Sequence, residues 1–346
     1  MRAIVKYDYQ DRSVEIKDID KPAIGPDQVL IKVAAVGVCG SDIHMWRNHQ
    51  SWKIKIPVVL GHEFCGVVAE VGDDVKSFAV GERVAVETAA YVCGECIFCR
   101  TGNYNLCPER LGYGNLIDGS MTEYVVARPQ ILHRLPDSIP FEHAALIEPI
   151  CVANRTILEV SNVKPGDIVV IQGAGAIGIF SMLMAKISGA GTIIVTGTDI
   201  DSKRLAIARD LGAHYTVNIQ QEDPVALIKT LGDGYGAHLV VDCTGVSAAL
   251  KQSIELVRPL GQITKVGWGP QPMNFSLDPL VQKAARIQTS FSHTYATWER
   301  SIAMLAAGLI PLDFMQGCVY EMESWETAFS EMESGNNIKS VIKMGA

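Results

Sequence analysis

The second half of the sequence alternates short apolar strands with helical segments, and this alternation limits the fold more than any other feature. Strand signals lie at Asp167–Ile171, Thr192–Thr196, Leu239–Cys243 and Gln262–Val266, and helix signals lie at Ile177–Ser188, Ser202–Leu211 and Ser247–Val257. Strands that alternate with helices are joined by crossovers, and such strands form a parallel sheet with helices packed on it. We therefore predict an α/β fold with a doubly wound parallel sheet in this part of the chain.

A glycine-rich turn, Gly173-Ala-Gly175-Ala176-Ile177-Gly178, follows the first of these strands and opens the first helix. In this context the first glycine makes the tight turn, the second lets the backbone approach a pyrophosphate, and the third packs the helix on the strand. The N–H groups at the start of the helix, among them those of Ala176 and Ile177, can bind phosphate oxygens. We predict a dinucleotide site here; the alternative is a tight turn without a ligand.

The adenosine end of the cofactor is expected about 20 residues farther on, because an acid at that separation normally accepts the ribose hydroxyls of NAD. Asp199 lies near this position, and the same segment carries the cations Lys203 and Arg204, which could meet the 2′-phosphate of NADP. Alternatively, Asp201 or Ser202 caps a helix whose first turn is solvated. We favour NAD held by Asp199, with NADP held near Arg204 as the alternative.

Four cysteines, Cys93, Cys96, Cys99 and Cys107, lie within fifteen residues. The chain opens without a signal-peptide pattern, so we expect a cytoplasmic protein whose thiols stay reduced, and a dense cluster then indicates metal ligation before disulfides. Four thiolates with no open position are typical of structural zinc. A disulfide pair is the alternative.

A second set of ligand types lies outside this cluster: Cys39, His62, Glu63 and Glu148. One thiolate, one imidazole and one carboxylate leave a fourth position for water or substrate, as catalytic zinc requires. Taken singly, each residue has an ordinary structural explanation, such as a buried thiol or a hydrogen-bonded histidine. Their order and spacing make the pattern informative.

Length and charge exclude several classes of function. The 346 residues are enough for two domains, and the formal net charge of −8 offers no basic stripe for a nucleic acid. No apolar run approaches the roughly 18 residues that a membrane span needs. Small molecules are therefore the expected partners.

The chain resembles the zinc-dependent medium-chain dehydrogenases, and within them the polyol branch that includes the sorbitol dehydrogenases. The motifs that carry the resemblance follow in the family's order: GVCGSDIH, GHEFCGVVAEVG, VGERVAVE, CGECIFCRTGNYNLC, GSMTEYVV, IEPICV, GAGAIG and MLAAGLIPL. The resemblance implies a GroES-like β-rich catalytic domain over residues 1–154, to which residues 291–346 return, and a Rossmann domain over 155–290.

The resemblance also implies the roles of individual residues. Cys39 and His62, with a carboxylate from Glu63 or Glu148, would bind catalytic zinc, and the four clustered cysteines a second, structural zinc. Ser41 and His44 match positions that pass the alcohol proton outward, and Glu148 matches a carboxylate that acts directly or through water. A homo-oligomer, tetramer or dimer, is expected.

The expected reaction is oxidation of a secondary hydroxyl of a polyol, or of a related sugar alcohol or sugar acid, to a ketone, with hydride transfer to NAD or NADP. A threonine or other alcohol dehydrogenase, and a zinc- and nucleotide-binding regulator without turnover, are the alternatives. Two positions depart from the polyol branch: Gly197 stands where the ribose-binding acid usually lies, and Phe291–Trp298 lacks the Arg-Tyr pair of sorbitol dehydrogenases.

Overall fold

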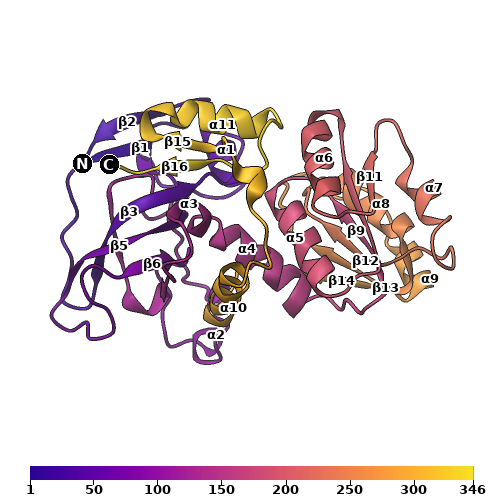
Figure 1. The fold of residues 1–346 in the computed structure, drawn as a ribbon, viewed down its shortest axis with the longest axis horizontal. Coiled ribbons are helices and arrows are strands. Elements are labelled where there is room, and N and C mark those ends of the chain that lie inside the picture. The colour runs from indigo at the N-terminus through magenta and orange to yellow at the C-terminus, as the bar shows by residue number, and fades with distance from the viewer. Residues whose placement is uncertain (346) are drawn as a thin grey trace. The chain divides into compact units, whose positions relative to one another are not determined.

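The computed structural model describes residues 1–345, which form two compact units (Figure 1). The first unit contains residues 1–148, 293–333 and the stretch from 339 onward; the second contains residues 149–292 and 334–338. Helix α4 (Ile147–Asn154) begins in the first unit and continues in the second. From the sequence we expected the changes of domain at 154/155 and 290/291, with no later return to the second unit.

The first unit is built on a seven-stranded sheet with the order β15-β16-β3-β5-β6-β8, in which β7 also pairs with β3. Its strands are β3 (Val29–Gly37), β5 (Glu63–Val71), β6 (Arg83–Val86), β7 (Tyr124–Ala127), β8 (Leu132–Arg134), β15 (Val319–Glu321) and β16 (Val341–Lys343). A smaller sheet joins β1 (Arg2–Lys6), β2 (Val14–Asp18) and β4 (Val58–Val59). Valine and isoleucine are frequent in β3, β5 and β6, as is usual for strands that pack on a core.

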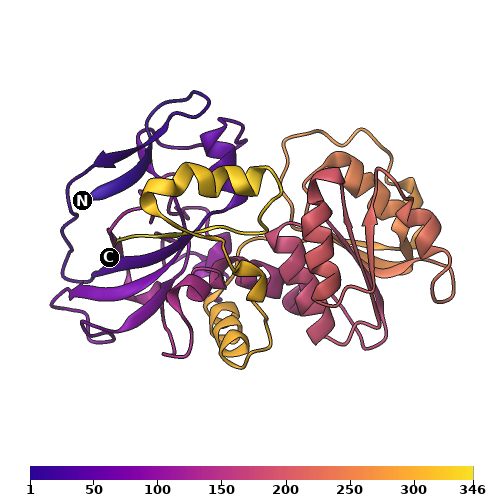
Figure 2. The same cartoon turned by 45° about the horizontal axis from the view of Figure 1, so that its top comes forward.

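Both ends of the chain contribute to this unit. Strand β16 pairs antiparallel with β3, so that Ile342 lies opposite Val36. The helices are α1 (Gly40–Trp46), α2 (Ile97–Arg100), α3 (Phe141–Ala144), α10 (Tyr295–Ala306) and α11 (Trp325–Glu333). Figure 2 shows α11 and β16 in yellow beside the indigo N-terminal elements, and the rings of Trp46 and Trp325 pack at 6.2 Å.

The second unit contains a six-stranded sheet with the order β11-β10-β9-β12-β13-β14, in which every neighbouring pair is parallel. Its strands are β9 (Ile168–Gln172), β10 (Thr192–Gly197), β11 (Tyr215–Asn218), β12 (Ala237–Asp242), β13 (Val257–Lys265) and β14 (Arg286–Thr289). Its helices are α5 (Ala176–Ile187), α6 (Ser202–Asp210), α7 (Pro224–Ile228), α8 (Ser247–Leu256) and α9 (Asp278–Lys283). The strand order reverses between β9 and β12, which is where such sheets bind ligands.

A short late segment, residues 334–338, packs in the second unit. A side chain at Gly335 would come within 2.3 Å of the carbonyl oxygen of Ile200, and the Arg204 guanidinium donates to the Asn337 carbonyl at 2.8 Å. These contacts explain why this segment clusters with the second unit although the elements on either side of it belong to the first.

None of the helices within residues 1–345 combines the length and the apolar character that crossing a membrane would require.

Candidate functional site

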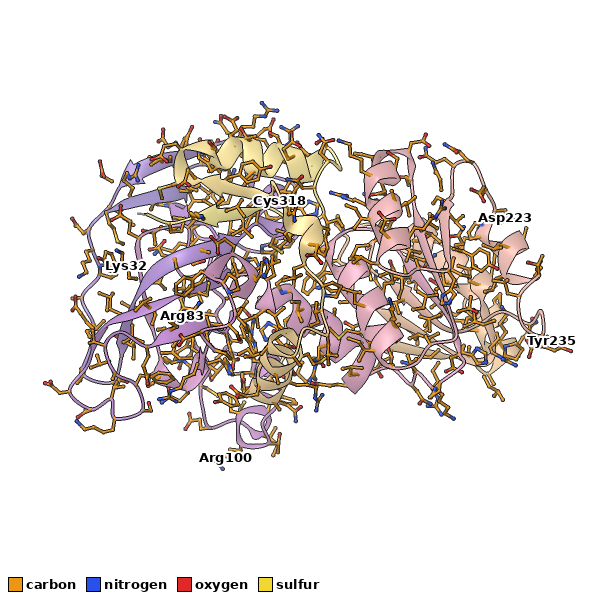
Figure 3. All side chains as sticks on the ribbon, in the orientation of Figure 1. Lys32, Arg83, Arg100, Asp223, Tyr235 and Cys318 are labelled. Atoms are coloured by element: carbon orange, nitrogen blue, oxygen red, sulfur yellow. The ribbon has the colours of Figure 1, made fainter. Side chains whose placement is uncertain are left out.

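The four clustered cysteines lie together in the loop that carries α2. Their sulfur atoms are all within 4.8 Å of one another, with Cys93 Sγ at 3.6 Å from Cys107 Sγ and 3.9 Å from Cys99 Sγ. Zn–S bonds of about 2.3 Å set sulfur–sulfur separations of about 3.8 Å in a tetrahedron, whereas a disulfide bond is about 2.05 Å long. The residues therefore fit a closed zinc site; Arg100, at the end of α2, marks this loop in Figure 3.

Backbone N–H groups favour the thiolate form of Cys93. The Cys96 N–H donates to Cys93 Sγ at 3.3 Å, and the Cys99 N–H donates to Cys96 Sγ at 3.4 Å. Hydrogen bonds from Cys96 and Glu95 lower the pKa of Cys93 to about 7. Metals bind the thiolate form of cysteine, so a thiol that ionises near neutral pH is well suited as a ligand.

The second candidate metal group consists of Cys39, His62 and Glu63, whose ligand atoms also lie within 4.8 Å of one another. Cys39 follows the end of β3 and precedes α1, while His62 directly precedes β5 and Glu63 is its first residue. Because β3 and β5 are antiparallel neighbours with Gly37 opposite Glu63, the end of one strand meets the beginning of the other. One sulfur, one nitrogen and one oxygen donor fit a zinc site with an open position.

Asp42 ties the two turns of this site together. Its carboxylate is fully buried; Oδ2 accepts from the Cys39 N–H at 2.9 Å, and Oδ1 accepts from the Gly61 N–H at 3.2 Å. One side chain therefore fixes the backbone next to both Cys39 and His62. No role was predicted for Asp42, although it lies inside the GVCGSDIH motif.

Negative groups surround His62. Burial opposes the charged form of the imidazole, but Cys39, Asp42 and Glu148 outweigh it and raise the pKa of His62 to about 10. The same anions would attract a metal cation to this place. The electrostatic environment therefore agrees with the ligand types.

Glu63 is paired with Lys339, a residue that the sequence analysis missed. Lys339 Nζ lies 2.6 Å from Oε1 and 2.5 Å from Oε2, and both side chains are almost fully buried. Burial raises the pKa of Glu63, and Lys339 counters this rise. Although burial also opposes the charged form of Lys339, the anions Glu63, Cys39 and Glu148 together raise its pKa.

Glu148 is not among the three residues of the close metal group, although its charge acts on His62. The carboxylate, at the start of α4, lies 3.1 Å from His293 Nε2. Burial opposes ionisation of Glu148, but the His293 hydrogen bond and the charges near it outweigh burial and lower its pKa. Of the two carboxylates expected as zinc ligands, Glu63 lies next to Cys39 and His62. Glu148 lies outside this group and is hydrogen-bonded to His293.

Ser41 and His44 both lie on α1. Ser41 Oγ is buried and has no hydrogen-bond partner among residues 1–345, and no hydrogen bond joins it to His44 in the described chain. His44 is exposed, with its ring 6.3 Å from that of Trp52. Partial burial and the neighbouring His49 lower the pKa of His44. A proton could therefore pass from Ser41 to His44 only through a group that bridges the two side chains.

The glycine-rich turn joins β9 to α5. Gly173 has φ = 97°, and a Cβ on Gly178 would come within 1.8 Å of the Gly173 carbonyl oxygen. Gly175 is the N-cap of α5, ahead of Ala176 and Ile177, and a Cβ there would project into open space. The backbone at this helix start is therefore accessible to a phosphate group.

The segment after β10 places its charged side chains in different environments. Asp199 is exposed, and its Oδ1 accepts from the Asn218 amide at 2.6 Å and from the Gln221 amide at 2.9 Å. Arg204 donates to Asp201 Oδ1 at 3.0 Å as well as to the Asn337 carbonyl. Both side chains are therefore held by protein groups, but the Asp199 carboxylate is also exposed to solvent.

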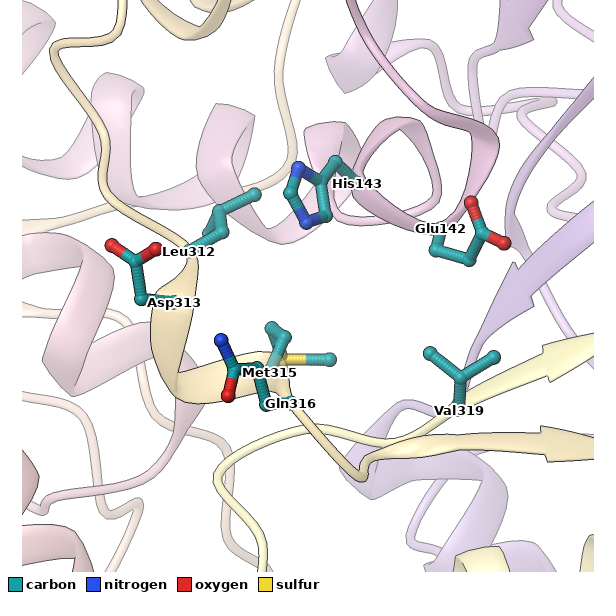
Figure 4. Close-up of a pocket in the computed structure, with 7 residues that line it drawn as sticks. All are labelled: Glu142, His143, Leu312, Asp313, Met315, Gln316 and Val319. Atoms are coloured by element: carbon teal, nitrogen blue, oxygen red, sulfur yellow. The ribbon is translucent and has the colours of Figure 1, made fainter.

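A separate hollow of about 200 Å³ lies in the first unit (Figure 4). Glu142 and His143 of α3 face Met315 and Gln316 across it, and Leu312, Asp313 and Val319 complete its lining. None of these residues belongs to either cluster of candidate metal ligands within residues 1–345. This hollow is distinct from the candidate site.

Two family models match this chain, one in its N-terminal part and one in its C-terminal part. Residues 25–137 match the model of the alcohol dehydrogenase GroES-like domain, and residues 176–307 match the model of the zinc-binding dehydrogenases. The chain belongs to the zinc-binding dehydrogenase family. The predicted family, the α/β fold class and an oxidoreductase activity of the zinc-dependent dehydrogenase type are thereby confirmed.

Two similar members of the family are named for a polyol and for a polyol phosphate. The chain is 38% identical over 343 residues to a sorbitol dehydrogenase of Halalkalibacterium halodurans, covering 99% of both chains. It is 39% identical over 327 residues to a D-arabitol-phosphate dehydrogenase of Enterococcus avium, covering 94% of this chain and 92% of the relative.

Two solved structures of zinc-binding or related dehydrogenases have the same fold. An Escherichia coli dehydrogenase of unknown specificity superposes with a TM-score of 0.91 at 30% identity, over 100% of both chains. A zinc-binding dehydrogenase of Sinorhizobium meliloti, solved with NADP, gives 0.89 at 26% identity over 99% of this chain and 98% of that one.

Proposed function

We propose that this zinc-binding dehydrogenase oxidises a secondary hydroxyl of a polyol, or of a related sugar alcohol or sugar acid, to a ketone, with NAD as the preferred hydride acceptor. The observation that carries this proposal is the close group of Cys39, His62 and Glu63, a donor set that suits zinc with a position left for substrate. The polyol substrates in the names of two similar relatives support the substrate class.

Zinc in this group would act as a Lewis acid that lowers the pKa of the reacting hydroxyl, and the nicotinamide would accept the hydride. The protein itself must orient the substrate and remove a proton. The unpartnered hydroxyl of Ser41 is suited to accept the proton of the reacting hydroxyl. His44, exposed on the same helix, is suited to release that proton to solvent.

Glu148 supports the choice of polyols over simple alcohols. Its side chain is 10% exposed and negatively charged, so it can accept a hydrogen bond from a second substrate hydroxyl. A simple alcohol has no second hydroxyl for this contact. Glu148 could also bind the ammonium group of threonine, so threonine dehydrogenation is the competing reaction.

The cofactor preference rests on the segment after β10. A ribose with free hydroxyls can donate to the exposed Asp199 carboxylate, whereas a 2′-phosphate would be repelled by it. Arg204, the cation that would bind such a phosphate, is already held by Asp201 and Asn337. We therefore propose NAD over NADP.

The closed cysteine loop supports a second, structural zinc, so we propose two zinc ions per chain. We also infer a cytoplasmic homo-oligomer, either a tetramer or a dimer. Metal analysis of the purified protein tests the zinc content, and light scattering during size-exclusion chromatography tests the oligomeric state.

A substrate panel tests the reaction. C4 to C6 polyols, their phosphates, sugar acids and L-threonine are each offered with NAD and with NADP. We expect the highest kcat/KM for a polyol or sugar derivative with NAD. Preference for threonine would support the competing reaction, and two zinc ions per chain with no turnover on any compound would indicate a regulator.

A further inference from the structure

Three buried side chains in the first unit form a hydrogen-bonded series that starts at Glu148. His293 Nε2 lies 3.1 Å from Glu148 Oε1, and the Trp298 indole Nε1–H donates to His293 Nδ1 at 2.7 Å. His293 is 2% exposed and Trp298 is 1% exposed. Water therefore does not compete for either contact.

The chemistry of the indole fixes the direction of both hydrogen bonds. An indole nitrogen is a donor only, so His293 Nδ1 must use its lone pair to accept. A neutral imidazole that accepts through Nδ1 carries its proton on Nε2. His293 therefore donates to the Glu148 carboxylate and cannot accept from it.

We propose that His293 is the positioning residue of Glu148, and that Trp298 makes it so by holding the imidazole in the tautomer with its proton on Nε2. In this arrangement Oε1 of Glu148 is occupied by a donor, while Oε2 remains for a metal ion or a substrate hydroxyl. This role of Glu148 rests on the proposed function. The tautomer of His293 does not, because it follows from the hydrogen bond with Trp298.

Local sequence explains why the histidine and the tryptophan meet. Thr294 is the N-cap of α10, and its N–H donates to Thr297 Oγ1 at 3.3 Å. His293 thus precedes the N-cap and Trp298 is the fourth residue of the helix, the two positions whose side chains commonly pack together at a helix start. The start of α10 therefore brings the indole to the imidazole.

The indole is itself held in place from another side. Its ring stacks on that of His133 with an interplanar angle of 7° and a centroid distance of 5.3 Å. His133 in turn lies between two carboxylates, with Nε2 at 3.0 Å from Glu87 and Nδ1 at 2.6 Å from Glu299. A tryptophan fixed in this way cannot rotate to release His293 without breaking the stacking.

The two carboxylates of the site are therefore held by different means. Glu63 has a cation, Lys339, as its partner, whereas Glu148 has a neutral donor. A neutral donor orients a carboxylate without cancelling its charge. Glu148 consequently keeps the charge that attracts a metal or a hydroxyl proton.

The tautomer is tested by nuclear magnetic resonance of the zinc-loaded enzyme labelled with ¹⁵N-histidine. The His293 signals are identified by their loss in His293→Gln. We expect a proton on Nε2 in the wild type and a mixture of tautomers in Trp298→Phe, which keeps a ring but loses the donor. A wild-type proton on Nδ1, or an unchanged Trp298→Phe spectrum, would overturn the proposal whether or not a substrate has been found.

Trp46→Phe is the matched control. Trp46 is also 1% exposed, and its Nε1 has no hydrogen-bond partner among residues 1–345. The same loss of a buried indole N–H should leave the His293 signals as in the wild type. A tautomer change in this control would mean that the effect is general rather than specific to Trp298, and would count against the proposal.

Kinetics with the best substrate test the positioning role. His293→Phe removes both hydrogen bonds, and we expect kcat/KM to fall about 10- to 100-fold, the usual loss when a partner of a metal-site ligand is removed. His293→Gln offers an amide oxygen to Trp298 and an amide N–H to Glu148, so it should recover most of this loss. If Gln is as damaging as Phe, or Phe is harmless, His293 has no positioning role.

Discussion

Replacing Lys339 by methionine should destabilise the first unit strongly. The substitution keeps the length of the side chain but removes the ammonium group that lies 2.6 and 2.5 Å from the two oxygens of Glu63. In the zinc-free protein the carboxylate would then be buried without its counter-ion. Removal of one partner from a buried ion pair costs about 3–5 kcal/mol, because the remaining charge is uncompensated.

The side chains of Lys339 and Glu63 are only 2% and 1% exposed. We therefore expect the loss of unfolding free energy to lie in this range and not in the smaller range of a surface ion pair. The first unit has roughly 200 residues, a size at which 1 kcal/mol shifts Tm by about 2–4 °C. We therefore expect Tm of its transition to fall by about 6–20 °C. The assay is calorimetric unfolding, which resolves the transitions of the two units if they differ.

Two further variants separate the charge effect from simple truncation. In Lys339→Met/Glu63→Gln the orphaned carboxylate is also neutralised, so a large part of the stability should return. Lys6→Met is the control: Lys6 is fully buried, but its ammonium donates to the Gln10 carbonyl rather than to a carboxylate. If Lys339→Met costs no more than Lys6→Met, or if the double variant recovers nothing, the ion-pair argument is wrong.

Cys39→Ser should abolish turnover and leave the fold and nucleotide binding intact, as measured by activity, circular dichroism and NAD titration; retained activity with full zinc content would contradict its role as a ligand. Cys96→Ser should instead lower Tm and zinc content, because structural zinc contributes directly to folding, and an unchanged melting curve would count against a metal in that loop. For His44, burial and His49 lower the pKa, so the neutral form that accepts a proton persists below the usual value of about 6.5 and the acid limb of kcat should lie below that pH. His44→Ala should slow oxidation mainly on the acid side and regain activity with added imidazole; a profile identical to that of the wild type would leave His44 without a catalytic role.

Features that arise from neighbouring residues could be predicted from the sequence. The glycine-rich turn between β9 and α5 depends on six consecutive residues, and the cysteine loop depends on four thiols within fifteen. In both cases the spacing itself encodes the local geometry. The strands and helices around the turn were predicted within a few residues for the same reason, because periodicity is a local signal.

Contacts between distant residues could not be predicted. Lys339 lies 276 residues from Glu63, and nothing in the sequence next to Lys339 distinguishes it from an ordinary lysine that precedes a strand. His293 lies 145 residues from Glu148, although its contact with Trp298 is local and could have been inferred from the helix start. At Asp199 the sequence indicated the position but not the amides that hold the carboxylate.

The pairing of β16 with β3 imposes an order in time on the assembly of the enzyme. Glu63 leaves the ribosome 276 residues before Lys339, which at about 5–20 residues per second corresponds to roughly 14–55 s. Throughout this interval β3 lacks its neighbour β16, and the glutamate that faces Cys39 and His62 lacks its counter-ion. Residues 149–292, the main part of the second unit, are complete before Lys339 is made. The main part of the second unit can therefore fold before the last strand of the first unit's sheet has been made.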